Sequence, residues 1–183
     1  MNAYLIRRMK DEDVLAVVHV DAIAGILMPW SPNAYWGELR KKTTWCWVAE
    51  SITDEELEYR IAFCMPIDDV KYAAGELIVI GSVTMWRADY KFHIANIAVH
   101  PDFAGQGAGQ ALMEKAISGA RGRGAAQLWL EVRESNARAR RMYERFGFAA
   151  QGTRSGAYSN GEAAVSMSLP ITPQPLADAR AKF

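Results

Sequence analysis

The 183-residue sequence lacks several features that mark specialised proteins. Its two cysteines, Cys46 and Cys64, make no disulfide framework and have no metal-ligand spacing. The 21 Lys and Arg residues balance the 21 Asp and Glu residues, so the charge does not favour nucleic acid or a membrane surface as a partner. No apolar run is long enough to span a bilayer, and the first ten residues lack the apolar core of a signal peptide. We therefore expect a cytoplasmic protein without a metal site.

The length of the chain predicts one domain, which would bury roughly 70% of the surface that the unfolded chain exposes. We place this domain at residues 1–169. Residues 51–76 show no consistent periodicity and are interpreted as an insertion, and residues 170–183, with three prolines, are interpreted as a loose tail.

Apolar periodicity predicts an alternation of strands and helices along the domain. Strands are expected over residues 3–7, 43–50, 77–86, 91–99, 126–132, 149–157 and 163–169, and helices over 11–22, 32–40, 112–121 and 136–146. The strands at 91–99 and 126–132 are joined through a single helix, which predicts that they are parallel. This order of elements indicates an α+β fold with a layered sheet.

Three glycines at alternate positions, Gly105, Gly107 and Gly109, separate the strand at 91–99 from the following helix. Glycines let the backbone approach a ligand closely, and the free N–H groups at a helix start bind anions. A Walker loop would need a Lys that is absent here, and a dinucleotide loop would need a third Gly where Gln110 stands. The stretch therefore predicts a site for another kind of phosphate-bearing ligand, with a plain glycine-rich turn as the alternative.

Two motifs resemble those of the GNAT N-acetyltransferases. Residues 104–109 resemble the family's pyrophosphate loop, Gln/Arg-x-x-Gly-x-Gly/Ala, except that Ala104 replaces the usual Gln or Arg. The second motif matches the family pattern at every named position, Asn136-x-x-Ala139-x-x-x-Tyr143-x-x-x-Gly147-Phe148. Within the family, the closest resemblance is to the RimI-type ribosomal-protein alanine N-acetyltransferases. It is carried by Pro29-Trp30-Ser31, Asn96–Val99, Leu128–Asn136 and Met167–Ile171.

The resemblance implies the GNAT acyl-CoA N-acyltransferase fold, a mixed central sheet of about seven strands with helices on both faces. It implies acetyl-CoA as co-substrate and no metal. The backbone of Ile97, Ala98 and Val99 would pair with the pantetheine arm, and Asn136 and Tyr143 would also contact the cofactor. The pyrophosphate would be held by the loop residues Gly105, Gln106, Gly107, Ala108, Gly109 and Gln110.

Transfer of an acetyl group to an amine needs a base for the amine and an acid for the departing thiolate. Glu131 interrupts the apolar run of the strand at 126–132, where a carboxylate is costly unless it is paired or used. By chemistry alone, two explanations of Glu131 are equally good: a salt bridge, with Arg133 for instance, and the role of general base. The resemblance favours the role of base. His93 is the competing base, but counting alternation from Ile97 places it with Ala95 and Val99 as a satisfied, half-buried histidine. The resemblance assigns the role of acid to Tyr143.

The acceptor is expected to be the N-terminal α-amino group of a protein, with ribosomal proteins as the candidate class. At neutral pH roughly 10% of an α-amino group is neutral, against less than about 0.1% of a lysine side chain. Trp30, Trp86 and Tyr158 are candidates for lining the acceptor groove, although each is equally explained by packing. Two alternatives remain: an acetyltransferase of a small amine such as a polyamine, aminoglycoside or amino acid, and a non-catalytic acyl-CoA-binding module. The sequence leaves the oligomeric state open.

Overall fold

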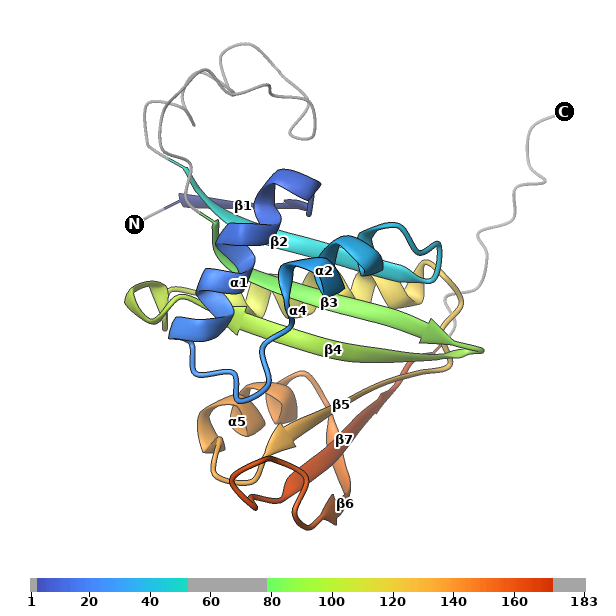
Figure 1. The fold of residues 1–183 in the computed structure, drawn as a ribbon. Coiled ribbons are helices and arrows are strands. Elements are labelled where there is room, and N and C mark those ends of the chain that lie inside the picture. The colour runs from blue at the N-terminus through green and yellow to red at the C-terminus, as the bar shows by residue number, and fades with distance from the viewer. Residues whose placement is uncertain (1–2, 53–78, 173–183) are drawn as a thin grey trace, which may run out of the picture.

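A computed structural model describes residues 3–52 and 79–172 (Figure 1). The predicted insertion lies outside the described residues from residue 53 on, together with Cys64. The predicted tail lies outside them from residue 173 on.

Seven strands form one mixed sheet with the order β1-β2-β3-β4-β5-β7-β6. All neighbouring strands are antiparallel except β4 and β5, which are parallel as predicted. The seven predicted strands are all present, with shifted ends. Their bounds are β1 Ala3–Arg8, β2 Thr44–Ile52, β3 Val79–Ala88, β4 Lys91–Val99, β5 Gln127–Arg133, β6 Ala149–Arg154 and β7 Ala164–Pro170.

Helices cover both faces of this sheet, which confirms the expected fold. In Figure 1, α1 (Val14–Ile23) and α2 (Pro32–Leu39) lie in front of the sheet and α4 (Ala108–Arg121) lies behind it. The last helix, α5 (Ala137–Arg145), packs on the same side as α4. Short 3-10 turns precede α1 and α4, at Asp11–Asp13 and Pro101–Phe103.

Each face of the sheet has its own apolar core. The larger core joins α4 and α5 to side chains from β2 to β7, among them Phe92, Leu112 and Leu130. The smaller core joins α1 and α2 to Cys46 and Val48 of β2. A side chain on a central strand therefore faces either the larger core or the smaller one, depending on its position in the alternation along the strand.

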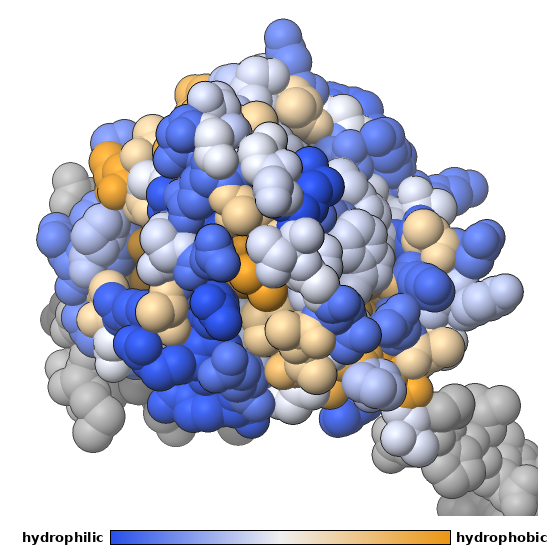
Figure 2. Space-filling view, turned by 90° about the horizontal axis from the view of Figure 1, so that it is seen from below, coloured by the Kyte–Doolittle hydropathy of each residue, from blue (hydrophilic) through white to orange (hydrophobic). Residues whose placement is uncertain are grey.

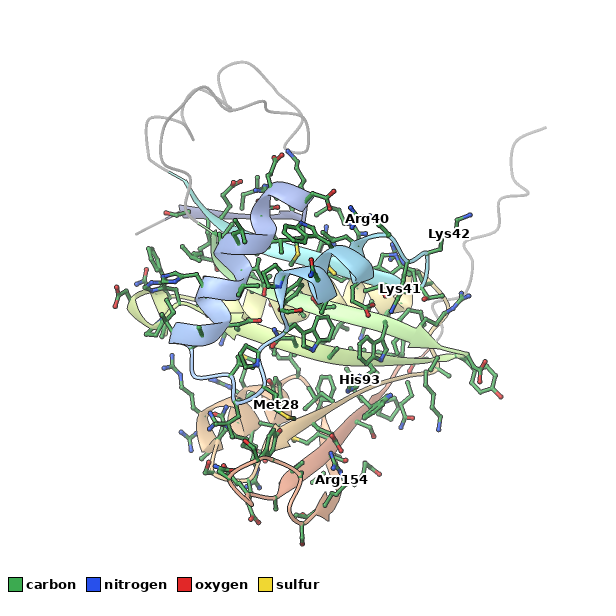
Figure 3. All side chains as sticks on the ribbon, in the orientation of Figure 1. Met28, Arg40, Lys41, Lys42, His93 and Arg154 are labelled. Atoms are coloured by element: carbon green, nitrogen blue, oxygen red, sulfur yellow. The ribbon has the colours of Figure 1, made fainter. Side chains whose placement is uncertain are left out.

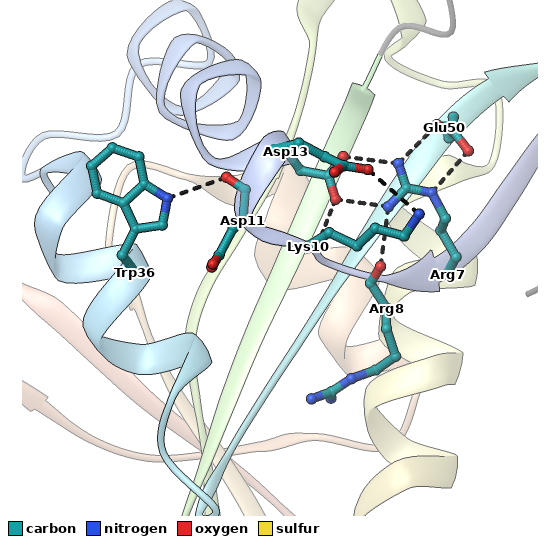
Figure 4. Close-up of polar contacts among 8 residues, drawn as sticks. Arg7, Arg8, Lys10, Asp11, Asp13, Trp36 and Glu50 are labelled. Carbon is teal, nitrogen blue, oxygen red and sulfur yellow. Dashed lines mark hydrogen bonds and ion pairs between the residues drawn. The ribbon is translucent and has the colours of Figure 1, made fainter. Parts of the chain in front are cut away.

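A buried charge network fixes the beginning of the chain to the sheet (Figure 4). The guanidinium of Arg7 on β1 donates to Asp13 at 2.7 and 2.8 Å and to Glu50 of β2 at 2.8 and 2.9 Å. All three side chains are less than 10% exposed. Burying charges is tolerated when they are paired and hydrogen-bonded in this way. The network holds the start of α1 against β1 and β2.

A β-bulge interrupts β4 at Ala95. The side chains of β4 therefore do not alternate between the two faces of the sheet as predicted from the sequence. Thr84 of β3 pairs with Asn96 and Met85 pairs with Ile94, so Ala95 has no partner on β3. An extra residue in one strand reverses the faces that follow it. His93 and Asn96 consequently lie on the α1–α2 face, whereas Val99 lies beside Gly109 of α4. The prediction that His93 shares a face with Val99 was wrong.

Two other boundaries differ from the prediction. Strand β3 continues to Ala88 rather than ending at the predicted residue 86, so the hairpin to β4 turns at Asp89 and Tyr90, where Asp89 adopts a positive φ of 56°. Strand β6 ends at Arg154 rather than at Ala157, so a longer loop leads to β7. Tyr158 is carried by that loop.

Candidate active site

The parallel strands β4 and β5 separate halfway along their length. Pairing runs from Lys91 with Gln127 to Ile94 with Leu130 and then stops. Residues 97–99 of β4 still pair with β3, but the other edge of their backbone has no strand partner in the described part of the chain. Buried backbone N–H and C=O groups need hydrogen-bond partners. The free edge of Ile97, Ala98 and Val99 could therefore pair with an extended ligand arm, and the assignment of these residues to the pantetheine arm stays a prediction.

The glycine loop lies just beyond this free edge, where Gly107 is the N-cap of α4. Gly105 and Gly107 have φ values of +85° and +96°, a region that residues with a Cβ rarely adopt. A Cβ on Gly107 would also lie 2.8 Å from the Tyr4 hydroxyl. No side chain among the described residues caps α4, so the first amides of the helix are available for an anion.

Asn136 is the N-cap of α5 at the end of β5, as predicted. Its Oδ1 accepts a hydrogen bond from the backbone N–H of Ala139 at 3.1 Å. The carboxamide oxygen is thus occupied by the helix start, and the amide NH₂ is the group left to contact a cofactor.

Glu131 points away from the larger core, because Leu130 and Val132 occupy the opposite face of β5. The salt bridge that was the alternative explanation is present, but with Arg154 of β6 rather than Arg133. The Ser166 hydroxyl of β7 also donates to Oε1 of Glu131 at 3.4 Å. Arg154 donates from Nη2 to Oε2 at 2.8 Å and from Nε to Oε1 at 3.4 Å. The Glu131 side chain is 30% exposed and that of Arg154 is 59% exposed. The carboxylate is therefore both paired and accessible.

Tyr143 lies on the buried face of α5, with its ring 5.9 Å from that of Phe148. Burial raises the pKa of Tyr143, and the neighbouring Tyr158 raises it further. Burial also raises the pKa of Tyr158, and the charge of Glu131 adds to this effect. Tyr158 thus interacts electrostatically with both Tyr143 and Glu131, although Tyr143 belongs to the larger core and Glu131 points away from it.

The predicted aromatic residues Trp30 and Trp86 belong to a continuous row on the α1–α2 face. Trp30 and Trp86 stack at 5.7 Å, Trp86 contacts the ring of His93 at 5.1 Å, and His93 stacks on Trp129 at 3.8 Å. Trp129 lies on the same face of β5 as Glu131. The row therefore leads from the α1–α2 loop to the carboxylate. Figure 3 shows His93 between β4 and β5 and Arg154 near β7.

His93 is not the satisfied histidine that the sequence predicted. Its Nδ1 is buried and has no hydrogen-bond partner among the described residues. Burial lowers the pKa of His93 to about 4, and the charge of Glu131 opposes this lowering. The imidazole is consequently neutral at neutral pH and a weak base.

We expect the low pKa of His93 to make stability depend on pH. A histidine in an unfolded chain has a pKa of about 6.5, so between pH 6.5 and about 4 the unfolded chain binds a proton that the folded protein does not. As the pH falls from 6.5 to about 4, the free energy of unfolding should decrease in both proteins, and it should decrease by about 1 kcal/mol per pH unit more in the wild type than in His93→Gln. Urea titrations at several pH values measure the difference. Parallel pH curves for the two proteins would contradict the expectation.

A second polar network, which the sequence did not reveal, anchors the α1–α2 loop beside the bulge. Asp21 of α1 accepts hydrogen bonds from the Tyr35 hydroxyl at 2.6 Å and from Nδ2 of Asn96 at 2.8 Å. Tyr35 also contacts the ring of Trp30 at 5.2 Å. Asp21 is fully buried, and burial raises its pKa. The sequence feature that could have indicated this network is Asp21 itself, a single carboxylate in the otherwise apolar helix α1.

Figure 2 shows the side of the molecule that carries α5 and the β6–β7 loop. It is largely hydrophilic, with separate small hydrophobic groups.

Within the described residues, no group of three or more His, Cys, Asp or Glu side chains is placed to hold a metal ion. No helix in residues 3–52 or 79–172 has the length and apolar character needed to cross a membrane.

The separated strands, the glycine loop at the start of α4 and the cap of α5 lie at the same end of β4 and β5. A family model described as "Acetyltransferase (GNAT) family" matches residues 30–148, more than half of the chain. The chain belongs to this family, which confirms the resemblance seen in the two motifs.

Individual relatives match in part. The [ribosomal protein bS18]-alanine N-acetyltransferase of Escherichia coli K12 is 48% identical over 80 residues, which are 42% of this chain and 54% of that protein. The chain thus matches about half the length of this relative. Streptothricin acetyltransferase of Streptomyces lavendulae is 41% identical over 102 residues, 54% of each protein. The crystal structure of the ribosomal-protein-S18-alanine N-acetyltransferase from Escherichia coli superposes with a TM-score of 0.71 and 27% identity, covering 99% of this chain and 100% of that one.

Proposed function

We propose that the protein transfers the acetyl group of acetyl-CoA to the N-terminal α-amino group of a protein, with ribosomal proteins that begin with alanine as the candidate substrates. The observation that carries the proposal is the free edge of β4 between the glycine loop and Glu131. It offers an extended path from a phosphate site to an accessible carboxylate. The relatives that act on ribosomal-protein alanine support the acceptor.

The residues of this chain fit each task of the reaction. The bound co-substrate supplies an acetyl group on a thioester. Backbone groups of residues 97–99 pair with its arm and polarise the carbonyl. Glu131 accepts a proton from the ammonium of the acceptor, after the acceptor displaces Arg154. The amine nitrogen then forms a bond to the carbonyl carbon while the carbon–sulfur bond breaks. Tyr143 donates its proton to the sulfur and regains a proton from the nitrogen of the new amide, while Glu131 releases its proton to solvent. The raised pKa of Tyr143 keeps its proton in place before the transfer.

A small amine is the second candidate acceptor. It is favoured by the similarity to streptothricin acetyltransferase, whose name states a small-molecule substrate. At the acceptor end two arginines, Arg133 and Arg154, accompany two carboxylates, Glu131 and Glu162, so the charge there shows no excess of carboxylates for a polyvalent cation. A polyamine carries several positive charges and would need more carboxylates than arginines, whereas an N-terminus carries one.

The test is release of coenzyme A from acetyl-CoA with a panel of acceptors. Peptides that begin with alanine, including ribosomal-protein N-termini, are compared with the same peptides blocked at the α-amino group and with polyamines, aminoglycosides and amino acids. We expect turnover with the free peptides and loss of turnover when the α-amino group is blocked. Turnover on small amines alone would exclude a protein acceptor. Coenzyme A binding without turnover on any acceptor would indicate the non-catalytic binding module.

A further inference from the structure

Two polar side chains approach the glycine loop without a protein partner. Nη2 of Arg138, on the first turn of α5, lies 3.7 Å from the position that a Cβ on Gly105 would occupy. The Tyr4 hydroxyl of β1 lies 2.8 Å from the corresponding position on Gly107. Neither side chain has a hydrogen bond or ion pair within residues 3–52 and 79–172. A guanidinium and a hydroxyl are therefore available where the loop leaves its backbone open.

The same loop lacks a cation of its own. Ala104 stands where the family pattern has Gln or Arg, and the other loop residues, 105–110, carry no charge. The backbone amides of α4 contribute only partial positive charge. A pyrophosphate carries full negative charges, and a guanidinium matches phosphate oxygens with two parallel N–H donors.

The position of Arg138 follows from the packing of two helices. Helix α4 begins after β4 and α5 begins after β5, so both starts lie at the end where these strands have separated. The helices are in close contact there, since a Cβ on Gly109 of α4 would lie 3.7 Å from the Met142 sulfur of α5. Arg138 thus reaches the loop from across the site, 34 positions further along the chain than Ala104.

We propose that Arg138 supplies, from α5, the cationic side chain that the loop lacks at Ala104, and that its guanidinium binds the pyrophosphate of coenzyme A. Tyr4 donates a second hydrogen bond to the same group. The inference rests on the proposed function, because it takes coenzyme A as the ligand. It adds a binding residue that neither sequence motif names, since residue 138 is a variable position of the second motif.

The experiment compares the binding of coenzyme A and of pantetheine, which has no phosphate, by calorimetry. Arg138→Gln should raise the Kd for coenzyme A about tenfold, the size expected of one charge-assisted contact, and leave the Kd for pantetheine unchanged. Arg138→Lys should recover part of the loss. The control is Arg145→Gln, on the last turn of the same helix, which should change the Kd less than about twofold. Added salt should weaken coenzyme A binding less in Arg138→Gln than in the wild type.

A second variant moves the cation back into the loop. The double variant Arg138→Gln with Ala104→Arg should regain most of the lost affinity for coenzyme A, which a merely structural role of Arg138 does not predict. The inference is overturned if wild type and Arg138→Gln bind coenzyme A with the same Kd. It is also overturned if Arg138→Gln weakens the binding of coenzyme A and of pantetheine by the same factor. Those results leave the proposed function standing. If the wild type itself does not bind coenzyme A, the proposed function fails as well.

Discussion

Replacing Glu131 by Gln is expected to lower kcat for acetyl transfer by about 100- to 10,000-fold, the range that general base catalysis contributes. The amide keeps the size of the side chain and a hydrogen bond to Arg154, but it cannot accept the proton of the acceptor ammonium. The variant should fold normally, because the Glu131 side chain is 30% exposed and is not part of either apolar core. Steady-state rates with acetyl-CoA and an alanine peptide measure the effect, and the Kd for coenzyme A should not change.

Arg154→Gln is the matched control for Glu131→Gln. It removes the ion pair at 2.8 Å and leaves the carboxylate in place. If Glu131 serves only to hold β5 to β6, both variants should lose activity to the same extent. If Glu131 is the base, Arg154→Gln should lose less than about tenfold, since an exposed ion pair contributes little to stability. Near-normal turnover of Glu131→Gln would remove the assignment of the base.

Tyr143→Phe is expected to lower kcat by about 100-fold or more, because the departing thiolate loses its proton donor. The substitution removes only the hydroxyl from a side chain that is 5% exposed, so the packing against Phe148 is retained. Single-turnover rates at saturating acetyl-CoA report the chemical step directly. The Kd for coenzyme A and the midpoint of thermal unfolding serve as controls for binding and folding.

The pH profile gives a second measure of Tyr143. An ordinary tyrosine loses its proton near pH 10, and the pKa of Tyr143 is raised above this value by burial. A raised pKa means that the proton-donating form persists as the pH increases. The wild-type kcat should therefore show no loss from Tyr143 up to about pH 10. If Tyr143→Phe keeps its kcat within about threefold of the wild type at any pH in the profile, Tyr143 is not the acid.

Local sequence patterns were sufficient for the elements that build the cofactor end. Strand 91–99 depends on residues close to one another in the chain and lies where the pattern predicts. Helix α4 also follows the glycines but begins at Ala108, before the predicted residue 112, so that Gly109 lies inside the helix. The cap of α5 by Asn136 is equally local, since it joins residues three positions apart. Glycine conformation and helix capping act over a few residues, and the sequence therefore carries their signal.

The acceptor end could not be predicted in the same way. A bulge at Ala95 arises from the pairing of β4 with β3, so counting along β4 alone misplaced His93. The partner of Glu131 was misjudged because Arg154 lies 23 residues away on a strand that is not adjacent to β5. Contacts of this kind depend on strand order and register, which a single-sequence pattern does not specify.

The amino-acid sequence by itself determined the order of strands and helices, the uncapped glycine loop and the two family motifs, because each depends on neighbouring residues. Only the tertiary structure decided which side chains meet. It separated β4 from β5 beyond Ile94, joined Trp30 to Trp129 through His93, and brought Arg138 over a loop that has no cation. The physical reason is that sheet register and helix packing, rather than sequence distance, set which groups come within contact range.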